Sequence, residues 1–288
     1  MTQPDLPFIL KRPEHWMSGV IFASPHSGKE YPGWFLDSTS LPKKVLRSSE
    51  DAFVDRLIDR ASEYGAVTLS ARMPRCLIDL NRGPDEIDPL VVRGVPRHPL
   101  NQRTLAGLGV IPRVVSQGRI IHKRPLSRDE AESRINTYWH PYHEALSALI
   151  TEAREKFGQA LLIDMHSMPR DALSHLHGHR PEFVLGNRYG LSASARVLDV
   201  VANTIEAEGW TVRRNSPFSG AYICSTYGRP GRNIHVVQVE IDRSLYMDET
   251  TITPYPCFDI FADRLHNVIR KLSAFDSRIN PDESIAAE

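Results

Sequence analysis

Cysteine is scarce in this chain, and no two cysteines form a CxxC pair. Cys76, Cys224 and Cys257 lie far apart in the sequence. Small secreted domains depend on paired cysteines, whereas an odd and sparse set is typical of reduced thiols. The cysteine content therefore argues against a disulfide framework and predicts a cytoplasmic protein.

The chain also lacks an excess of either charge and any long apolar stretch. Lys plus Arg and Asp plus Glu both number 35, whereas proteins that coat nucleic acids or bind anionic membranes usually carry a basic excess. No window approaches the roughly 18 uninterrupted apolar residues of a membrane span. Residues 1–16 contain no apolar stretch long enough for a signal peptide. We therefore expect neither a nucleic acid nor a membrane as a partner.

No internal repeat, low-complexity segment or Gly/Ser linker divides the chain. Its 288 residues suffice for one large α/β domain, and we expect residues 1–288 to form a single catalytic domain. Residues 276–288 are mostly polar or small, and we expect them to fray. Residues 83–127 are basic and rich in proline, and we expect them to form a long loop or lid over the site.

Short runs rich in Val, Ile and Leu alternate with helical patterns. The runs typical of buried strands are residues 19–24, 66–71, 76–80, 160–164, 182–185 and 235–241, with residues 211–214 as a weaker candidate. The patterns typical of amphipathic helices are residues 51–64, 128–157, 192–209 and 257–275. Ser192 is a candidate N-cap, and Pro141 is expected to kink or divide the second helix. The alternation predicts an α/β fold with a mixed, mostly parallel central sheet covered by helices on both faces.

In such a sheet, ligands bind at the carboxyl ends of the strands. The first, third, fourth and sixth of the predicted strands deliver polar residues there, namely His26, Asn81 with Arg82, His166 and Glu240. Two imidazoles, a carboxylate and a guanidinium are the groups that metal-assisted amide hydrolysis needs. We therefore expect them to meet at one edge of the sheet.

The chemistry of zinc explains these residue types. Zn²⁺ takes nitrogen and carboxylate oxygen from three protein ligands and keeps a fourth position for water, whose pKa it lowers to about 7. A carboxylate such as Glu240 then moves the proton to the leaving amine. A cation such as Arg82 stabilises the oxyanion or holds a substrate carboxylate. We predict Zn²⁺ or another divalent metal on His26 and His166.

The third ligand is less clear from the residues alone. Asp51 is our choice, because it opens the first predicted helix soon after the His26 loop, and Glu50 is its rival. The alternative is that both acids stabilise the N-terminus of that helix, where negative charge is favoured.

Other candidate site residues could have a purely structural role instead of a functional one. Asp164 lies two residues before His166 on the same strand face, so it either orients an imidazole or pairs with a buried arginine. Ser27, next to His26, is a second candidate for a supporting contact. A carboxylate in an apolar strand is costly unless it is paired or functional, so Glu240 is either a catalytic base or an ion-pair partner of Arg243.

Ordered motifs give the chain a resemblance to the N-formylglutamate amidohydrolase family over about residues 20–249. The matching pieces are SPHSGKEYP (24–32), DAFVDRL (51–57), CLIDLNR (76–82), YWHPYHEAL (138–146), DMHS (164–167), PFSGAYICSTYGRP (217–230) and VQVEIDRSLYMDE (237–249). This family resembles zinc carboxypeptidases (phosphorylase/hydrolase-like proteins) in fold. The resemblance implies His26, Asp51 and His166 as metal ligands, Glu240 as general base and Arg82 as the cation near the scissile carbonyl or the substrate carboxylate.

The leading hypothesis is hydrolysis of the amide of an N-acyl amino acid, with N-formyl-L-glutamate giving formate and L-glutamate. This substrate carries two carboxylates, so an arginine beyond Arg82 should line the pocket. Arg188 and Arg214 are candidates, and Asn81 either contacts substrate or closes a turn with Arg82. The arginines of the segment 83–127, namely Arg93, Arg97, Arg103 and Arg113, are either further substrate-binding residues or surface charge. The alternatives are a carboxypeptidase-like or other acyl-amino-acid deacylase, and a non-catalytic protein that binds a metal or anion on the same fold.

Overall fold

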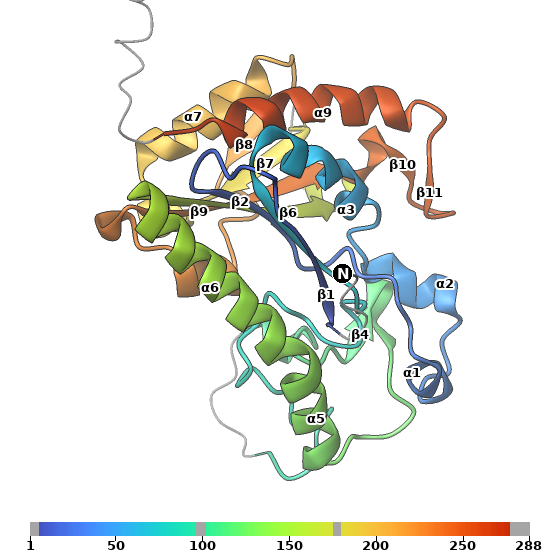
Figure 1. Cartoon of the computed structure of the whole chain (residues 1–288). Coiled ribbons are helices and arrows are strands. Elements are labelled where there is room, and N and C mark those ends of the chain that lie inside the picture. Colours follow the sequence, from blue (N-terminus) through green and yellow to red (C-terminus); the bar gives the residue numbers. More distant parts are fainter. Residues whose placement is uncertain (1–5, 96–101, 175–179, 277–288) are drawn as a thin grey trace, which may run out of the picture.

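A mixed sheet runs through the centre of the computed structural model, which describes residues 6–95, 102–174 and 180–276 (Figure 1). Within these residues the sheet has the strand order β1-β3-β2-β6-β9-β7-β8. The strands are β1 Phe8–Lys11, β2 Val20–Ser24, β3 Val67–Ala71, β6 Ala160–Met168, β7 Phe183–Gly186, β8 Val212–Arg214 and β9 Ile234–Asp242. Strands β3, β2, β6 and β9 are parallel, whereas β1 and β7 run antiparallel to their inner neighbours. The predicted mixed, mostly parallel sheet is confirmed.

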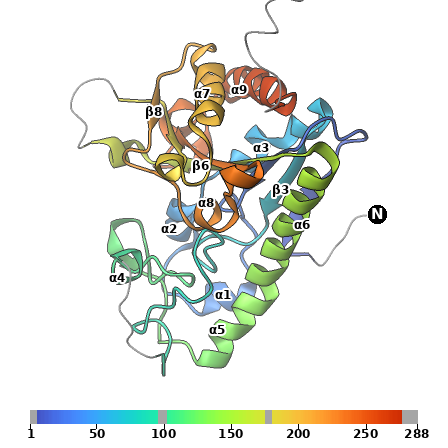
Figure 2. The same cartoon turned by 90° about the vertical axis from the view of Figure 1, so that its left-hand side faces the viewer.

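Helices cover both faces of this sheet, as the sequence predicts. Helices α3, α7 and α9 lie on one face, and α6 lies on the other with α5 continuing its line (Figures 1 and 2). The described α-helices are α1 Gly33–Asp37, α2 Lys43–Leu46, α3 Val54–Leu57, α4 Gln102–Leu105, α5 Arg128–Arg134, α6 His140–Phe157, α7 Ala195–Glu206, α8 Tyr222–Tyr227 and α9 Phe258–Ser273. None of the described helices is both long enough and apolar enough to cross a membrane.

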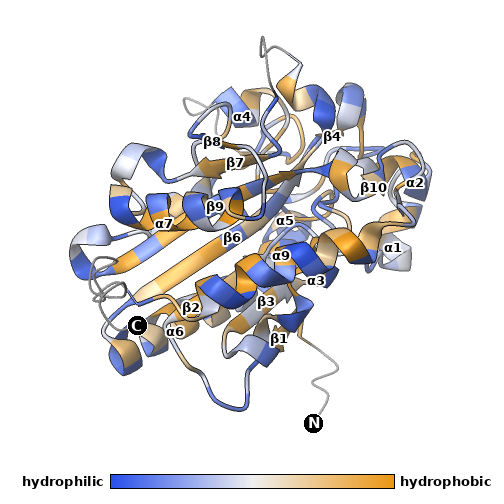
Figure 3. Cartoon of the chain, turned by 90° about the horizontal axis from the view of Figure 1, so that it is seen from above, coloured by the Kyte–Doolittle hydropathy of each residue, from blue (hydrophilic) through white to orange (hydrophobic). Residues whose placement is uncertain are grey.

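Apolar side chains fill both faces of the sheet, because successive residues of a strand point to opposite sides. In β6, Ile163 packs in the core under α7 and α9, and Leu162 packs in the core beside α6. Every residue of β6 is buried, and most of its ribbon is orange in Figure 3. The same alternation puts Asp164 and His166 on the face of Leu162, so polar groups enter this layer only near the end of the strand.

Residues 76–80, predicted as a strand, form turns instead. Leu77 is fully buried, so the apolar run reflects burial in the core and not pairing in the sheet. The backbone N–H of Leu77 donates to the Pro74 carbonyl at 2.9 Å, and that of Asp79 donates to the Val110 carbonyl at 2.7 Å. Strand β1, which the sequence reading did not predict, occupies the edge beside β3. The residues that follow Asp79 therefore reach the site on a loop.

The helix predicted over residues 51–64 begins later and is shorter. It consists of α3 and the 3₁₀ turn Asp59–Tyr64, and it cannot extend backwards because Phe53 has a left-handed backbone with φ of 68°. Asp51 therefore lies before the helix, and its N–H donates to the carbonyl of His26 at 2.9 Å. This hydrogen bond ties the Asp51 loop to the end of β2.

Two other helix boundaries differ in detail. The helix predicted over residues 128–157 is interrupted, as expected. The interruption is a π-helical turn over Ile135–Trp139. Pro141 lies in the first turn of α6, where a missing N–H costs no intrahelical bond. The N-cap of α7 is Ser194 and not Ser192, because the Ser192 hydroxyl donates to the Val236 carbonyl at 2.8 Å.

The segment 83–127 contains α4 and a small hairpin of β4 Val114–Val115 and β5 Arg119–Ile120 in its described part. A second small hairpin joins β10 Met247–Asp248 and β11 Thr253–Pro254. Residues 96–101 of this segment lie outside the described residues, as do residues 277–288 of the predicted tail.

Candidate functional site

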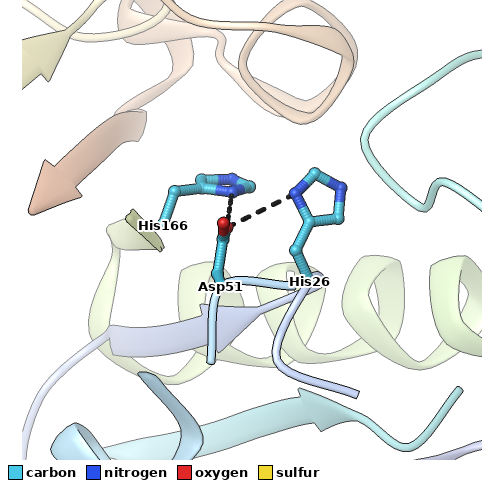
Figure 4. Close-up of side chains that lie close together, drawn as sticks. All are labelled: His26, Asp51 and His166. Atoms are coloured by element: carbon cyan, nitrogen blue, oxygen red, sulfur yellow. Dashed lines mark hydrogen bonds and ion pairs between the residues drawn. The ribbon is translucent and has the colours of Figure 1, made fainter. Parts of the chain in front are cut away.

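Two imidazoles and one aspartate meet just beyond the end of β2 and near the end of β6. Asp51 Oδ2 lies 3.0 Å from His166 Nδ1 and 3.5 Å from His26 Nδ1 (Figure 4). The two ring centroids are 4.7 Å apart, and one ligand atom from each residue lies within 4.8 Å of the others. All three side chains are buried. This cluster can hold a metal ion.

Two further carboxylates contact the other nitrogen of each ring. His26 Nε2 lies 2.7 Å from Asp79 Oδ1, and His166 Nε2 lies 3.0 Å from Asp164 Oδ2. A carboxylate on one nitrogen fixes the tautomer and orientation of an imidazole, so that the other nitrogen is free to bind metal. His26 Nδ1 is buried and has no hydrogen-bond partner among the described residues. A cation between the two Nδ1 atoms would satisfy this otherwise costly atom.

The structure brings Asp51, and not Glu50, to the histidines. The Glu50 carboxylate accepts hydrogen bonds from the Tyr31 hydroxyl at 2.5 Å and from Arg47 Nε at 3.1 Å, so it faces another network. Asp51 does not cap α3, since no side chain caps that helix. Neither acid therefore caps α3 through a side-chain hydrogen bond, and only Asp51 contacts the histidines.

Two arginines neutralise the acids of this cluster. Arg243 Nη2 lies 2.9 Å from Asp51 Oδ1, and Arg75 Nε lies 2.9 Å from Asp79 Oδ2. Arg243 is therefore committed to Asp51, and the suggested ion pair with Glu240 does not form. Buried carboxylates are tolerated only when such partners compensate for their lost hydration.

Glu240 lies on β9, in register with His166 on the neighbouring strand. Its carboxylate Oε1 accepts a hydrogen bond of 2.8 Å from Gln238 Nε2, and Gln238 Oε1 accepts one of 3.0 Å from the Ala221 N–H. Burial raises the pKa of Glu240 to about 7. A fixed carboxylate that titrates near neutral pH is suited to accept and return a proton.

Neighbouring carboxylates also shift the pKa of His166. Burial alone would lower its pKa, but the carboxylates of Asp164 and Asp51 outweigh burial and raise the pKa well above its usual value. The two neighbouring carboxylates therefore favour the protonated, positively charged form of His166.

Asn81 and Arg82 belong to the loop that follows Asp79. Asn81 Nδ2 lies 3.0 Å from His166 Nε2 and 3.3 Å from Asp164 Oδ2, and the side-chain oxygen Oδ1 of Asn81 accepts from the Ile223 N–H at 2.8 Å. Both polar atoms of Asn81 thus contact protein, although the residue lines the cavity. Arg82 donates through Nε to the Leu108 carbonyl at 2.9 Å and through Nη1 to the Asn81 carbonyl at 2.7 Å.

Three of the predicted site residues, Ser27, Arg188 and Arg214, do not belong to the cluster. Ser27 is buried, but its hydroxyl donates to the Ser24 carbonyl at 3.4 Å. Neither Arg188 nor Arg214 lines the cavity. The Arg214 guanidinium pairs with Asp199 on α7, because β8 is an edge strand and this side chain is exposed outside the cavity. These contacts do not support the prediction that Arg214 binds a substrate carboxylate.

The cluster opens into a cavity of about 390 Å³. This is the size of a small-molecule site, and residues of the segment 83–127 form part of its wall. Three residues of the site were not predicted from the sequence: Asp79, which contacts His26, and Arg75 and Gln238, which line the cavity. A signal existed for Asp79, which interrupts an apolar run in CLIDLNR as Asp164 does in LLIDMHS. Gln238 is likewise a polar residue inside an apolar strand, two positions before Glu240.

Fold and site together define an α/β protein with a buried His–Asp–His cluster that can hold a metal ion. Comparison with known families is consistent with this description. The model of the N-formylglutamate amidohydrolase family matches residues 18–247. The chain therefore belongs to the N-formylglutamate amidohydrolase family, and the resemblance seen in the motifs is confirmed.

Relatives cover nearly the whole chain. The N-formylglutamate deformylase of Pseudomonas aeruginosa is 30% identical over 257 residues, which cover 88% of this chain and 90% of that protein. The N-formylglutamate deformylase of Pseudomonas putida is 32% identical over 235 residues, covering 80% and 82% respectively. The crystal structure of N-formylglutamate amidohydrolase from Ralstonia eutropha JMP134 has a TM-score of 0.87 at 33% identity and covers 93% of this chain and 97% of its own. A gene product of Agrobacterium tumefaciens, 17% identical with a TM-score of 0.63, shares the fold.

The raised pKa of His166 predicts that metal binding releases a proton. A cation needs the unprotonated Nδ1, so zinc titrated into the metal-free protein at pH 7 should displace about one proton, and its apparent affinity should fall as the pH is lowered. Calorimetry in buffers of different ionisation enthalpy measures this release. The variant His15→Ala, which removes an exposed histidine, should behave as the wild type. Heats that do not depend on the buffer would contradict the assignment.

Proposed function

We propose that this protein is a metal-dependent amidohydrolase that converts N-formyl-L-glutamate and water into formate and L-glutamate. The observation that carries the proposal is the convergence of His26, Asp51 and His166 beside Glu240 in one cavity. Membership of the N-formylglutamate amidohydrolase family, and relatives named N-formylglutamate deformylase, support this choice of substrate. We further propose that residues 1–288 act as one catalytic domain, with the segment 83–127 covering the site.

The metal proposed here is Zn²⁺, held by His26, Asp51 and His166. Two imidazole nitrogens and one carboxylate oxygen are a donor set that suits zinc and leaves a position for substrate or water. When bound, the cation would supply a Lewis acid that polarises the formyl carbonyl and acidifies water. Asp79 and Asp164 support this role, because each hydrogen-bonds the Nε2 atom of one histidine and so directs its Nδ1 atom toward Asp51.

The protein's own groups would carry the proton and the charge. Glu240 takes a proton from the attacking water and passes it to the nitrogen of the leaving L-glutamate. Gln238 supports this step, because its hydrogen bond to Oε1 holds the carboxylate in one orientation. Arg82 binds the carboxylate next to the scissile amide, since a guanidinium fork matches a carboxylate in charge and shape. Asn81 helps to hold both His166 and Asp164 in place, because its Nδ2 atom contacts His166 Nε2 and Asp164 Oδ2.

A cytoplasmic location also belongs to this proposal. Its support is that the three cysteines are free, Cys76 and Cys224 in the core and Cys257 exposed. Free thiols of this kind persist in a reducing compartment.

Turnover with metal control tests the proposed reaction. The zinc-loaded protein should convert N-formyl-L-glutamate into equal amounts of formate and L-glutamate, chelation should abolish turnover, and added zinc should restore it. N-acetyl-L-glutamate and a dipeptide with C-terminal glutamate separate the reaction from those of other deacylases and of a carboxypeptidase. Equal activity in the chelated and the zinc-restored protein would refute the metal-dependent mechanism.

Replacement of Glu240 tests the proton transfer. Glu240→Gln keeps the shape of the side chain and removes its basicity, so kcat should fall by about 10²- to 10⁴-fold while the zinc content, measured by elemental analysis, stays the same. The matched control is Glu182→Gln, because Glu182 accepts a hydrogen bond from the Thr211 N–H and does not line the cavity. Unchanged kcat in Glu240→Gln would remove this residue from the mechanism.

A further inference from the structure

Four arginines line the cavity, but only two of them are neutralised by a carboxylate. Arg75 pairs with Asp79 and Arg243 pairs with Asp51. Arg82 and Arg103 also line the cavity, and neither forms an ion pair with a carboxylate of the described residues. The wall therefore offers two guanidinium groups whose charge is available to a ligand.

These two arginines lie at different depths. Arg82 is buried, with 6% of its surface exposed, and its hydrogen bonds to the Asn81 and Leu108 carbonyls hold it beside the loop of Asp79. Arg103 lies on α4 and is exposed, so it reaches the cavity from the solvent side. Burial lowers the pKa of Arg82, Asp79 opposes this shift, and repulsion by Arg75 and Arg103 adds to it. The charges of Arg82 and Arg103 therefore lie close enough to interact.

Backbone contacts tie α4 to the inner part of the site. The Leu108 N–H donates to the Arg103 carbonyl at 2.8 Å, and the Leu108 carbonyl in turn accepts from Arg82 Nε at 2.9 Å. Gly109 packs so closely that an added Cβ would lie 2.4 Å from the Glu86 carbonyl oxygen. These contacts therefore fix the backbone of α4 next to the segment that holds Arg82.

The proposed substrate has two carboxylates at unequal distances from the reacting bond. The α-carboxylate is attached to the carbon that bears the formylated nitrogen, and the side-chain carboxylate lies two carbons farther away. A buried guanidinium near the histidines suits the first, and a second guanidinium nearer to solvent suits the other. One arginine alone would bind N-formyl amino acids without regard to their side chain.

We propose that Arg103 is the residue that binds the side-chain carboxylate and so selects dicarboxylic substrates over neutral ones. This inference rests on the proposed function for the site but concerns a residue of α4 outside the metal cluster. Arg103 and Arg82 form a two-arginine subsite for an acidic amino acid. Discrimination arises because an isosteric amide such as glutamine leaves the Arg103 charge without a partner.

Binding and turnover of matched ligands test this role. The zinc-loaded wild type should bind L-glutamate more tightly than L-glutamine in calorimetry. Arg103→Gln should weaken L-glutamate binding about 10-fold, the usual effect of one charge-assisted hydrogen bond, and should leave L-glutamine binding within about twofold. The same variant should raise KM for N-formyl-L-glutamate more than it lowers kcat, and Arg103→Lys should retain most of the preference.

Arg214→Gln is the matched control, because Arg214 pairs with Asp199 outside the cavity, and its preference for L-glutamate should equal that of the wild type. The inference is overturned if the wild type has no preference, or if Arg103→Gln keeps it. If L-glutamate binding depends on Arg103 but no N-formyl amino acid is hydrolysed, the proposed reaction fails while the subsite stands.

Discussion

The orientation of two histidine rings is the constraint on which the rest of the site depends. An imidazole offers two nitrogens, and either can face a metal or a substrate. Asp79 and Asp164 remove this freedom, because each takes the Nε2 atom of one ring. Both Nδ1 atoms then face Asp51. The cluster is therefore defined as much by the two carboxylates behind the rings as by the ring nitrogens themselves.

Positions within the sheet could be predicted from the sequence, and positions in loops could not. Strands β2, β6 and β9 are mainly apolar and buried, and His26, His166 and Glu240 follow from the rule that parallel strands deliver their ends to one edge. The run at residues 76–80 has the same composition, yet it is a buried turn. Both kinds of segment are apolar because both are buried. Composition therefore does not distinguish a strand from a turn in the core.

The sequence also does not predict which arginines line the cavity. Arg214 is the last residue of strand β8, but this strand is at the edge of the sheet and the Arg214 side chain pairs with Asp199. Arg103 lies in a segment with no strong pattern and yet lines the cavity. Its placement depends on backbone hydrogen bonds between α4, Leu108 and Arg82, and no local sequence signal records such contacts.

The buried charges explain why this arrangement serves function and not stability. Asp51, Asp79, Asp164 and Glu240 are all buried, and removing such groups from water is costly even when they are paired. Arg75 and Arg243 offset part of that cost, and protonated His166 offsets more. A divalent cation bound between the rings would take over the role of the His166 proton, so metal binding and the electrostatics of the fold are coupled.

A crystal of the zinc-loaded protein, measured on both sides of the zinc absorption edge, tests the central claim most directly. The account predicts one strong anomalous peak within coordination distance, about 2 Å, of His26 Nδ1, His166 Nδ1 and an Asp51 oxygen. A peak that is bound elsewhere, or one that contacts only one of the two rings, would contradict it.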